Sequence, residues 1–284
     1  MYDKIVFVAD FFADQVKGGG ELNDWELIGL LRDMKCEVEL WNSNQIKVET
    51  VRQRISSGCK FIISNFASMP SDCMSVITSD GDYVIYEHDH KYLASRNPMN
   101  YPDLAAPQDK IINREFYEKA KAVFCQSFFH LNIINKNLQI DNLVNLSGNL
   151  WSISHLDILE EMAQSEKNDR HAVISYSIRH KNTEEAIRYC EYKGLKFDLI
   201  EPCAPEKFLK KLGKSSTLVF FPKSPETLSR IVVESRMMGM AVKTTKNIGA
   251  IHEDWFSKKG VDLINIMRDK RIKIPELVME KLGG

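Results

Sequence analysis

Two glutamates, Glu226 and Glu234, and the run between them carry the strongest chemical signal in the chain. Before them, Thr217–Phe221 is the most strand-like run of the C-terminal half; prolines then interrupt it, and apolar residues at helical spacing begin at Ile231. The pattern predicts a strand, a tight turn and a helix. The start of a helix favours an anion such as a phosphate, whereas the carboxylates suit hydroxyl groups. A ligand with hydroxyls on both sides of a diphosphate is a nucleotide sugar.

This stretch resembles the signature of retaining GT-B glycosyltransferases, family 4 in particular, in which seven residues separate two glutamates. The resemblance implies that Glu226 contacts the donor sugar and that Glu234 contacts the ribose of the nucleotide. The family usually has Gly-Phe-Gly after the first glutamate, and Thr227, Leu228 and Ser229 stand there instead. We expect these three residues to bind the donor. The alternative is a helix that carries two solvated carboxylates.

Composition limits the class of protein. The chain has 284 residues, of which 44% are hydrophobic and 27% charged, as in soluble globular proteins. A formal net charge of −1 gives no general attraction to nucleic acid, and no apolar run approaches the ~18 residues of a membrane span. The first strand-like run is interrupted by Asp10 too early for a signal peptide, and six scattered cysteines form no C-x-x-C pair. We therefore expect a cytoplasmic protein with buried, reduced cysteines.

The N-terminal half begins with a βαβ pattern. An apolar strand at Lys4–Ala9, a glycine-rich loop, a helix from Glu21 and a second strand predict part of a parallel sheet. The expected apolar face of that helix is formed by Leu22, Trp25, Ile28 and Leu31. The loop lacks the G-x-G-x-x-G pattern, which disfavours a dinucleotide site. By resemblance, Gly19 and Gly20 face the donor phosphate; the alternative is a bare loop.

A polar triplet, His88-Asp89-His90, follows the predicted strand Tyr83–Glu87, at the end of a parallel strand where ligands usually bind. A metal would need further ligands, and no H-x-x-H pair or cysteine lies nearby, so no metal is predicted. The preceding Asp80-Gly81-Asp82 is expected to form a turn. By resemblance, His88 is a catalytic residue near donor and acceptor, with Asp89 and His90 on the acceptor side. Structural hydrogen bonds within a loop are the alternative.

A second series of strands and helices follows Trp151, where we place the crossing between domains. The loop after its first strand holds Arg179 and Lys181, which by resemblance neutralise the leaving diphosphate; a solvated cationic loop is the alternative. By the same analogy, Cys203 and Ala204 lie beside the base of the nucleotide.

The order of these motifs extends over nearly the whole chain and predicts an α/β protein of GT-B architecture. Its two Rossmann-like domains, with parallel sheets that face each other across a cleft, are expected at residues 1–150, on the acceptor side, and 151–284, for the nucleotide sugar. Asn247–Ala250 resembles the family's glycine turn near the donor. Two closing helices, 262–268 and 275–282, are expected, and the last can pack back on the N-terminal domain.

The predicted function is transfer of a hexose from a nucleoside-diphosphate sugar to an unidentified acceptor, with retention of configuration. Cationic side chains and a helix start suffice to hold the diphosphate, so neither a metal nor a cofactor is predicted. The alternatives are a nucleotide-sugar epimerase on the same fold, a non-catalytic two-domain binding protein, and a degenerate transferase that acts as a scaffold. The sequence does not distinguish UDP, GDP and ADP as the nucleotide.

Overall fold

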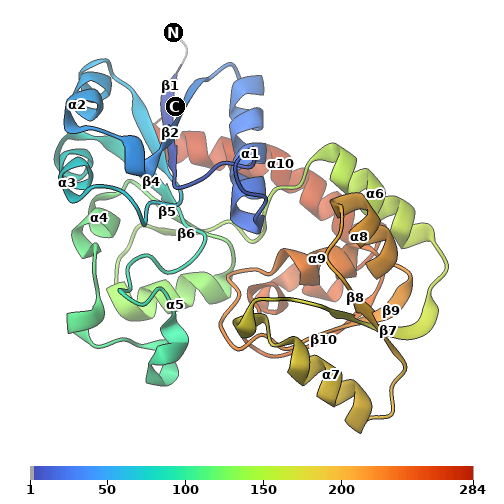
Figure 1. Cartoon of the computed structure of the whole chain (residues 1–284). Coiled ribbons are helices and arrows are strands. Elements are labelled where there is room, and N and C mark those ends of the chain that lie inside the picture. The colour runs from blue at the N-terminus through green and yellow to red at the C-terminus, as the bar shows by residue number, and fades with distance from the viewer. Residues whose placement is uncertain (1–2, 284) are drawn as a thin grey trace. The chain divides into compact units, whose positions relative to one another are not determined.

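A computed structural model describes residues 3–283. The chain forms two compact units, drawn in Figure 1. The first extends to Leu150 and includes the stretch from Lys270 onward, and the second is Trp151–Asp269. Each unit contains one sheet in which every strand pair is parallel.

The sheet of the first unit has the strand order β2-β1-β3-β4-β5-β6. The strands are β1 Lys4–Ala9, β2 Glu37–Asn42, β3 Lys60–Ile63, β4 Asp82–Tyr86, β5 Val123–Cys125 and β6 Leu143–Asn145. The central strands are continuous apolar runs because helices cover both faces of the sheet. In β1, Val6 and Val8 contribute to one core, whereas Ile5 and Phe7 contribute to the other.

The helices of this unit divide between the two faces of its sheet (Figure 1). They are α1 Gly19–Asp33, α2 Val48–Ser56, α3 Ser71–Asp80, α4 Arg114–Lys119, α5 Phe128–Leu138 and the end of α10 Val261–Leu282. Helices α2 to α5 share one core with the sheet, and α1 and α10 share the other. Where a turn was expected at Asp80–Asp82, a single extended residue, Gly81, joins α3, which ends at Asp80, to β4, which begins at Asp82.

The predicted face of helix α1 is wrong in part. Ile28 and Leu31 are buried, but Leu22 and Trp25 are 37% and 39% exposed. Two polar residues, Asn23 and Asp24, are buried instead. The helix also begins earlier than expected, so that Gly19 and Gly20 form its first turn rather than a loop.

Hydrogen bonds explain why this polar face of helix α1, rather than the predicted apolar one, points inward. The Asn23 side chain accepts a hydrogen bond from the Leu150 backbone N–H at 2.7 Å and donates one to the Tyr86 hydroxyl at 3.1 Å. A buried polar group is costly unless it is bonded, and here bonding decides which helix face points inward.

The closing segment is one helix rather than two. Helix α10 continues through Pro275, although a proline removes one helical hydrogen bond. Ile274 and Val278 flank it and are buried in the core of the first unit, which holds both sides of the helix in place. Among the helices of residues 3–283, α10 included, none combines the length and apolarity that crossing a bilayer requires.

The sheet of the second unit has the order β10-β9-β7-β8. Its elements are α6 Ile153–Gln164, β7 Asn168–Ile174, α7 Thr183–Tyr192, β8 Phe197–Ile200, α8 Pro205–Leu212, β9 Ser215–Phe220, α9 Arg230–Met237 and β10 Ala241–Thr244. A large core lies on one face, and a smaller one around Val173, Cys190 and Val219 lies under α7 (Figure 1).

Candidate functional site

The topology of the second unit locates a site. From β7 the chain passes to β8 on one side of it and then returns to β9 on the other side. Loops that leave the carboxyl ends of two such strands diverge, and open α/β sheets bind ligands at this point. The loop after β7 carries Arg179 and Lys181, and the loop after β9 carries Glu226. Cationic and anionic candidates are thus placed at one switch point.

Lys181 and Glu226 are in direct contact. The Lys181 ammonium donates to both carboxylate oxygens of Glu226, at 2.8 and 2.9 Å. The side chains are only 22% and 14% exposed. The ammonium also lies 5.8 and 5.9 Å from the ring centroids of Tyr176 and Phe220, within the range of cation–π attraction. The carboxylate of Glu226 is therefore not a solvated helix-face group.

The backbone of Glu226 is fixed by a second turn. Its N–H donates to the Asn247 carbonyl, and its own carbonyl accepts from the Gly249 N–H, both at 2.8 Å. The next bond joins the Ala250 N–H to the Leu228 carbonyl at 3.0 Å. The turn predicted at Asn247–Ala250 thus lies directly beside Glu226.

The turn that follows Glu226 is strained. Ser229 has φ +74°, in the left-handed region that favours glycine, and immediately precedes helix α9. Its hydroxyl is buried and has no hydrogen-bond partner among residues 3–283. Such strain costs about 1–3 kcal/mol and is common at ligand sites. Leu228, by contrast, has its side chain in the core, which leaves only its backbone for a ligand.

Arg179 points to an adjacent pocket. It is exposed and, with Lys223, Tyr176 and Asn182, lines an open pocket of ≈ 450 Å³ at the start of α7. Lys223 was not predicted. Its backbone N–H donates to the His180 carbonyl at 2.8 Å, which joins the loops after β7 and β9. Two further cationic side chains, those of Arg179 and Lys223, therefore line this pocket.

Glu234 is buried and already has partners within the second unit. One of its oxygens accepts from the Trp151 indole at 2.8 Å and lies 3.2 Å from the His155 imidazole and 3.8 Å from the Arg230 guanidinium. Burial raises the pKa of Glu234, but the contacts with His155, Arg230 and Trp151 outweigh it and hold that pKa below its usual range. The expected contact with a ribose stays a prediction for this carboxylate.

Two other predicted residues lie farther along the sheet. Cys203 is half-buried and Ala204 exposed, both between β8 and α8 at the edge of the second unit's sheet. No contact in the described residues ties them to the Lys181–Glu226 pair, and their place beside a base stays a prediction.

In the first unit, His88 is held from two sides. Its Nε2 lies 2.6 Å from Asp24, and its Nδ1 contacts the Gln126 amide. The Ser64 hydroxyl donates to the other oxygen of Asp24 at 2.6 Å. A Cβ at Gly20 would lie 3.3 Å from the His88 ring, so this glycine makes room for the imidazole. Packing against His88 is therefore one reason for a glycine at this position, and the expected approach of Gly20 to a phosphate stays a prediction.

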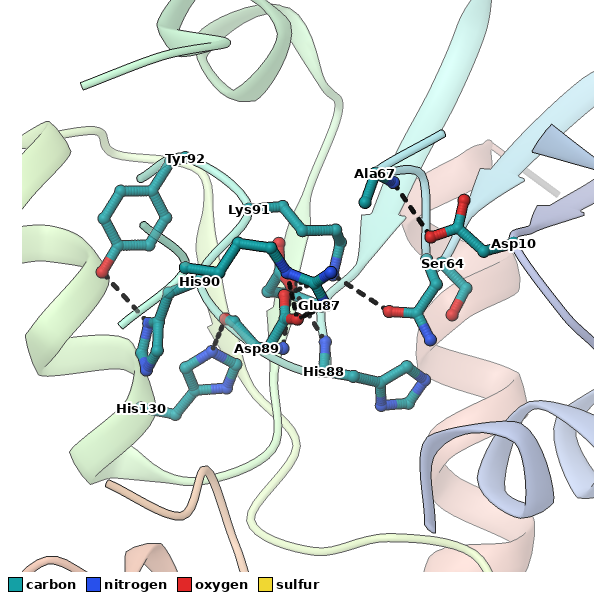
Figure 2. Close-up of polar contacts among 12 residues, drawn as sticks. Asp10, Ser64, Ala67, Glu87, His88, Asp89, His90, Lys91, Tyr92 and His130 are labelled. Carbon is teal, nitrogen blue, oxygen red and sulfur yellow. Dashed lines mark hydrogen bonds and ion pairs between the residues drawn. The ribbon is translucent and has the colours of Figure 1, made fainter. Parts of the chain in front are cut away.

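Lys91 is the centre of the polar network in Figure 2. Its ammonium contacts Glu87 and donates to Asp89 at 2.8 Å and to Asn65 at 3.3 Å. Burial lowers the pKa of Lys91, but Asp89 and Glu87 outweigh it and raise that pKa above its usual range. Arg96 provides a second cation for Asp89.

The predicted acceptor-side residues are internal members of this network. The Asp89 carboxylate is shared by Lys91 and Arg96, and its carbonyl accepts from His130 at 2.9 Å. His90 is buried, with Nδ1 3.1 Å from the Tyr92 hydroxyl (Figure 2). Burial lowers the pKa of His90 to about 4. His90 thus lies inside the first unit, and its expected position on the acceptor side stays a prediction.

Comparison with known proteins identifies the fold. No protein-family model matches the chain, and no curated protein matches it in sequence. Among solved structures, sucrose-phosphate synthase from Thermosynechococcus elongatus is 8% identical with a TM-score of 0.65, over 98% of each chain. HepE from Anabaena, in complex with UDP and glucose, is 14% identical with a TM-score of 0.53, over 96% of this chain and 90% of HepE. The chain has the GT-B fold, as predicted.

Proposed function

We propose that the chain is a glycosyltransferase that uses a nucleoside-diphosphate sugar, with UDP as the nucleotide. The contact between Lys181 and Glu226 at the switch point of the second unit's sheet carries this proposal. In this proposal the lysine is the cation for a diphosphate and the neighbouring carboxylate accepts from sugar hydroxyls. The choice of UDP is supported by HepE, which shares the fold and is described in complex with UDP and glucose.

In this scheme the chain's cations stabilise the leaving group. Lys181 binds the diphosphate together with the Ser229 hydroxyl and the start of α9, while Arg179 and Lys223 contribute from the neighbouring pocket. Negative charge on the diphosphate grows as the sugar departs, and fixed cations favour that change. Each charge-assisted hydrogen bond is worth about 1.5–3 kcal/mol. Transfer then needs no divalent metal, and retention of configuration follows from the family resemblance.

Glu226 has the complementary role of orienting the sugar. A carboxylate next to a diphosphate is repelled by it, and hydrogen bonds donated by sugar hydroxyls offset this repulsion. The oxygen of Glu234 that Trp151 and His155 leave unbonded is proposed to accept from the ribose. The acceptor of the transferred sugar remains unassigned.

The test is calorimetric titration of UDP in the presence of a chelator. We expect wild-type protein to bind UDP, and Lys181→Ala to weaken binding roughly 10- to 100-fold, the loss of one charge-assisted contact. Uridine, which lacks the diphosphate, should bind both proteins equally. Lys258→Ala, at an exposed lysine of the same unit, is the matched control and should change neither affinity.

Catalysis is tested separately by slow hydrolysis of UDP-glucose, which Glu226→Ala should abolish. If the protein binds neither UDP nor UDP-glucose, the proposed function, with UDP as the nucleotide, is wrong. Binding that appears only with Mg²⁺ would overturn the metal-free scheme, and an equal loss of UDP and uridine affinity in Lys181→Ala would overturn the role of this lysine.

A further inference from the structure

Lys181 and Glu226 neutralise each other in a direct ion pair. We infer that this pair makes the site select an intact nucleotide sugar over the free nucleoside diphosphate, so that Glu226 opposes binding of the product nucleotide. The inference rests on the proposed function and assigns Glu226 a role in specificity in addition to orienting the sugar.

The pair is closed on itself. Both carboxylate oxygens bind the same ammonium, at 2.8 and 2.9 Å, and within residues 3–283 neither side chain has another ion-pair partner. Both are largely shielded from water. A ligand that takes Lys181 away therefore leaves the Glu226 carboxylate without a counter-charge, in surroundings where water compensates only in part.

The backbone on both sides is held in place. Two hydrogen bonds of 2.8 Å join Glu226 to the turn at Asn247–Gly249, and the Lys181 N–H donates to the Ile178 carbonyl at 3.0 Å. The rings of Tyr176 and Phe220 flank the ammonium. The Lys223 N–H also joins the two loops by its hydrogen bond to the His180 carbonyl. Because the backbone is held in this way, a bound ligand must replace Glu226 as the partner of Lys181, and Lys181 as the partner of Glu226.

Two ligands differ in what they offer in this exchange. A nucleotide sugar brings diphosphate oxygens for Lys181 and hydroxyl donors for Glu226, so both charges regain partners. A free nucleoside diphosphate brings only the anion, which also repels the abandoned carboxylate. Glu226 therefore favours the intact donor and promotes release of the nucleotide after transfer.

The experiment is calorimetric titration of UDP and of UDP-glucose into wild-type protein, Glu226→Gln and Glu184→Gln. Removing the charge of Glu226 should tighten UDP binding at least fivefold and weaken UDP-glucose binding, so that the preference for UDP-glucose falls at least tenfold. Glu184 is an exposed carboxylate that lines the adjacent pocket. Glu184→Gln controls for a general loss of negative charge and should shift both affinities by a similar factor.

A second variant separates the effect of the Glu226 charge from the effect of its side-chain length. Glu226→Asp keeps the carboxylate but shortens the side chain, so we expect UDP affinity within twofold of wild type and loss of the preference for UDP-glucose. If Glu226→Gln does not fold, this variant decides, and a retained preference would overturn the inference.

The failures are distinguishable. If wild-type protein binds UDP but Glu226→Gln binds it no tighter, the inference is wrong while the proposed function stands. If wild-type protein binds neither UDP nor UDP-glucose, the proposed function fails, and the inference with it.

Discussion

Lys91 and Lys181 lie beyond the carboxyl ends of parallel strands, and each contacts a glutamate. They differ in burial and in their number of partners. Lys91 and Glu87 are 1% and 0% exposed, and Asp89 and Asn65 also accept hydrogen bonds from this lysine. Lys181 has one carboxylate partner and keeps some contact with water.

This difference separates a structural network from an exchangeable contact. A buried charge is tolerated only when its partners satisfy it, and in the first unit they do so several times over: Tyr117 contacts Glu87, and Arg96 shares Asp89 with Lys91. A ligand that took Lys91 would leave the buried Glu87 without a cation and Asp89 with Arg96 alone. The Lys181–Glu226 pair can open at lower cost, since a bound ligand can replace both partners.

The largest expected effect is on folding. Lys91→Met should lower the free energy of unfolding of the first unit by about 3–5 kcal/mol, because it leaves the buried Glu87 without its cation and Asp89 with Arg96 alone. Urea unfolding measures the change. Lys110→Met is the matched control: this lysine pairs with Asp109 at the surface, and its loss should change stability little. A loss below 1 kcal/mol for Lys91→Met would mean that the network is not structural.

The next effect depends on pH. Burial lowers the pKa of His90 to about 4 from its ordinary 6.5. Because the unfolded chain binds the proton first as the pH falls, His90 leaves stability unchanged above pH ~6.5. Its contribution becomes unfavourable below that and reaches about 3 kcal/mol near pH 4. Urea unfolding at pH 7.5 and 5 should show a larger loss for wild type than for His90→Gln. Equal losses would contradict the burial of a neutral imidazole.

The sequence was sufficient for some parts of this picture because their signals are local. An apolar run such as Lys4–Ala9 predicts a buried strand. In the second unit, the strand order seen in the structure then brings the loops with Lys181 and Glu226 to one switch point. The partners of His88 could not be predicted, since Asp24 lies 64 residues away on a helix whose polar residues give no sign of facing inward. Asn23, Asp24 and Glu26 all stand among the apolar residues of this helix, and their types do not tell which of them is buried.

The smallest expected effect is on the stability of the second unit. Lys181→Met should cost about 1–2 kcal/mol in unfolding, because Glu226 loses its counter-charge and the rings of Tyr176 and Phe220 lose the ammonium, while the pair keeps some contact with water. A double-mutant cycle with Glu226→Gln, followed by urea unfolding, gives the energy of the pair itself. A coupling of several kcal/mol would mean that this pair, like the one at Lys91, is structural, and a diphosphate could then not separate it at reasonable cost. A small coupling is what an exchange with ligand requires.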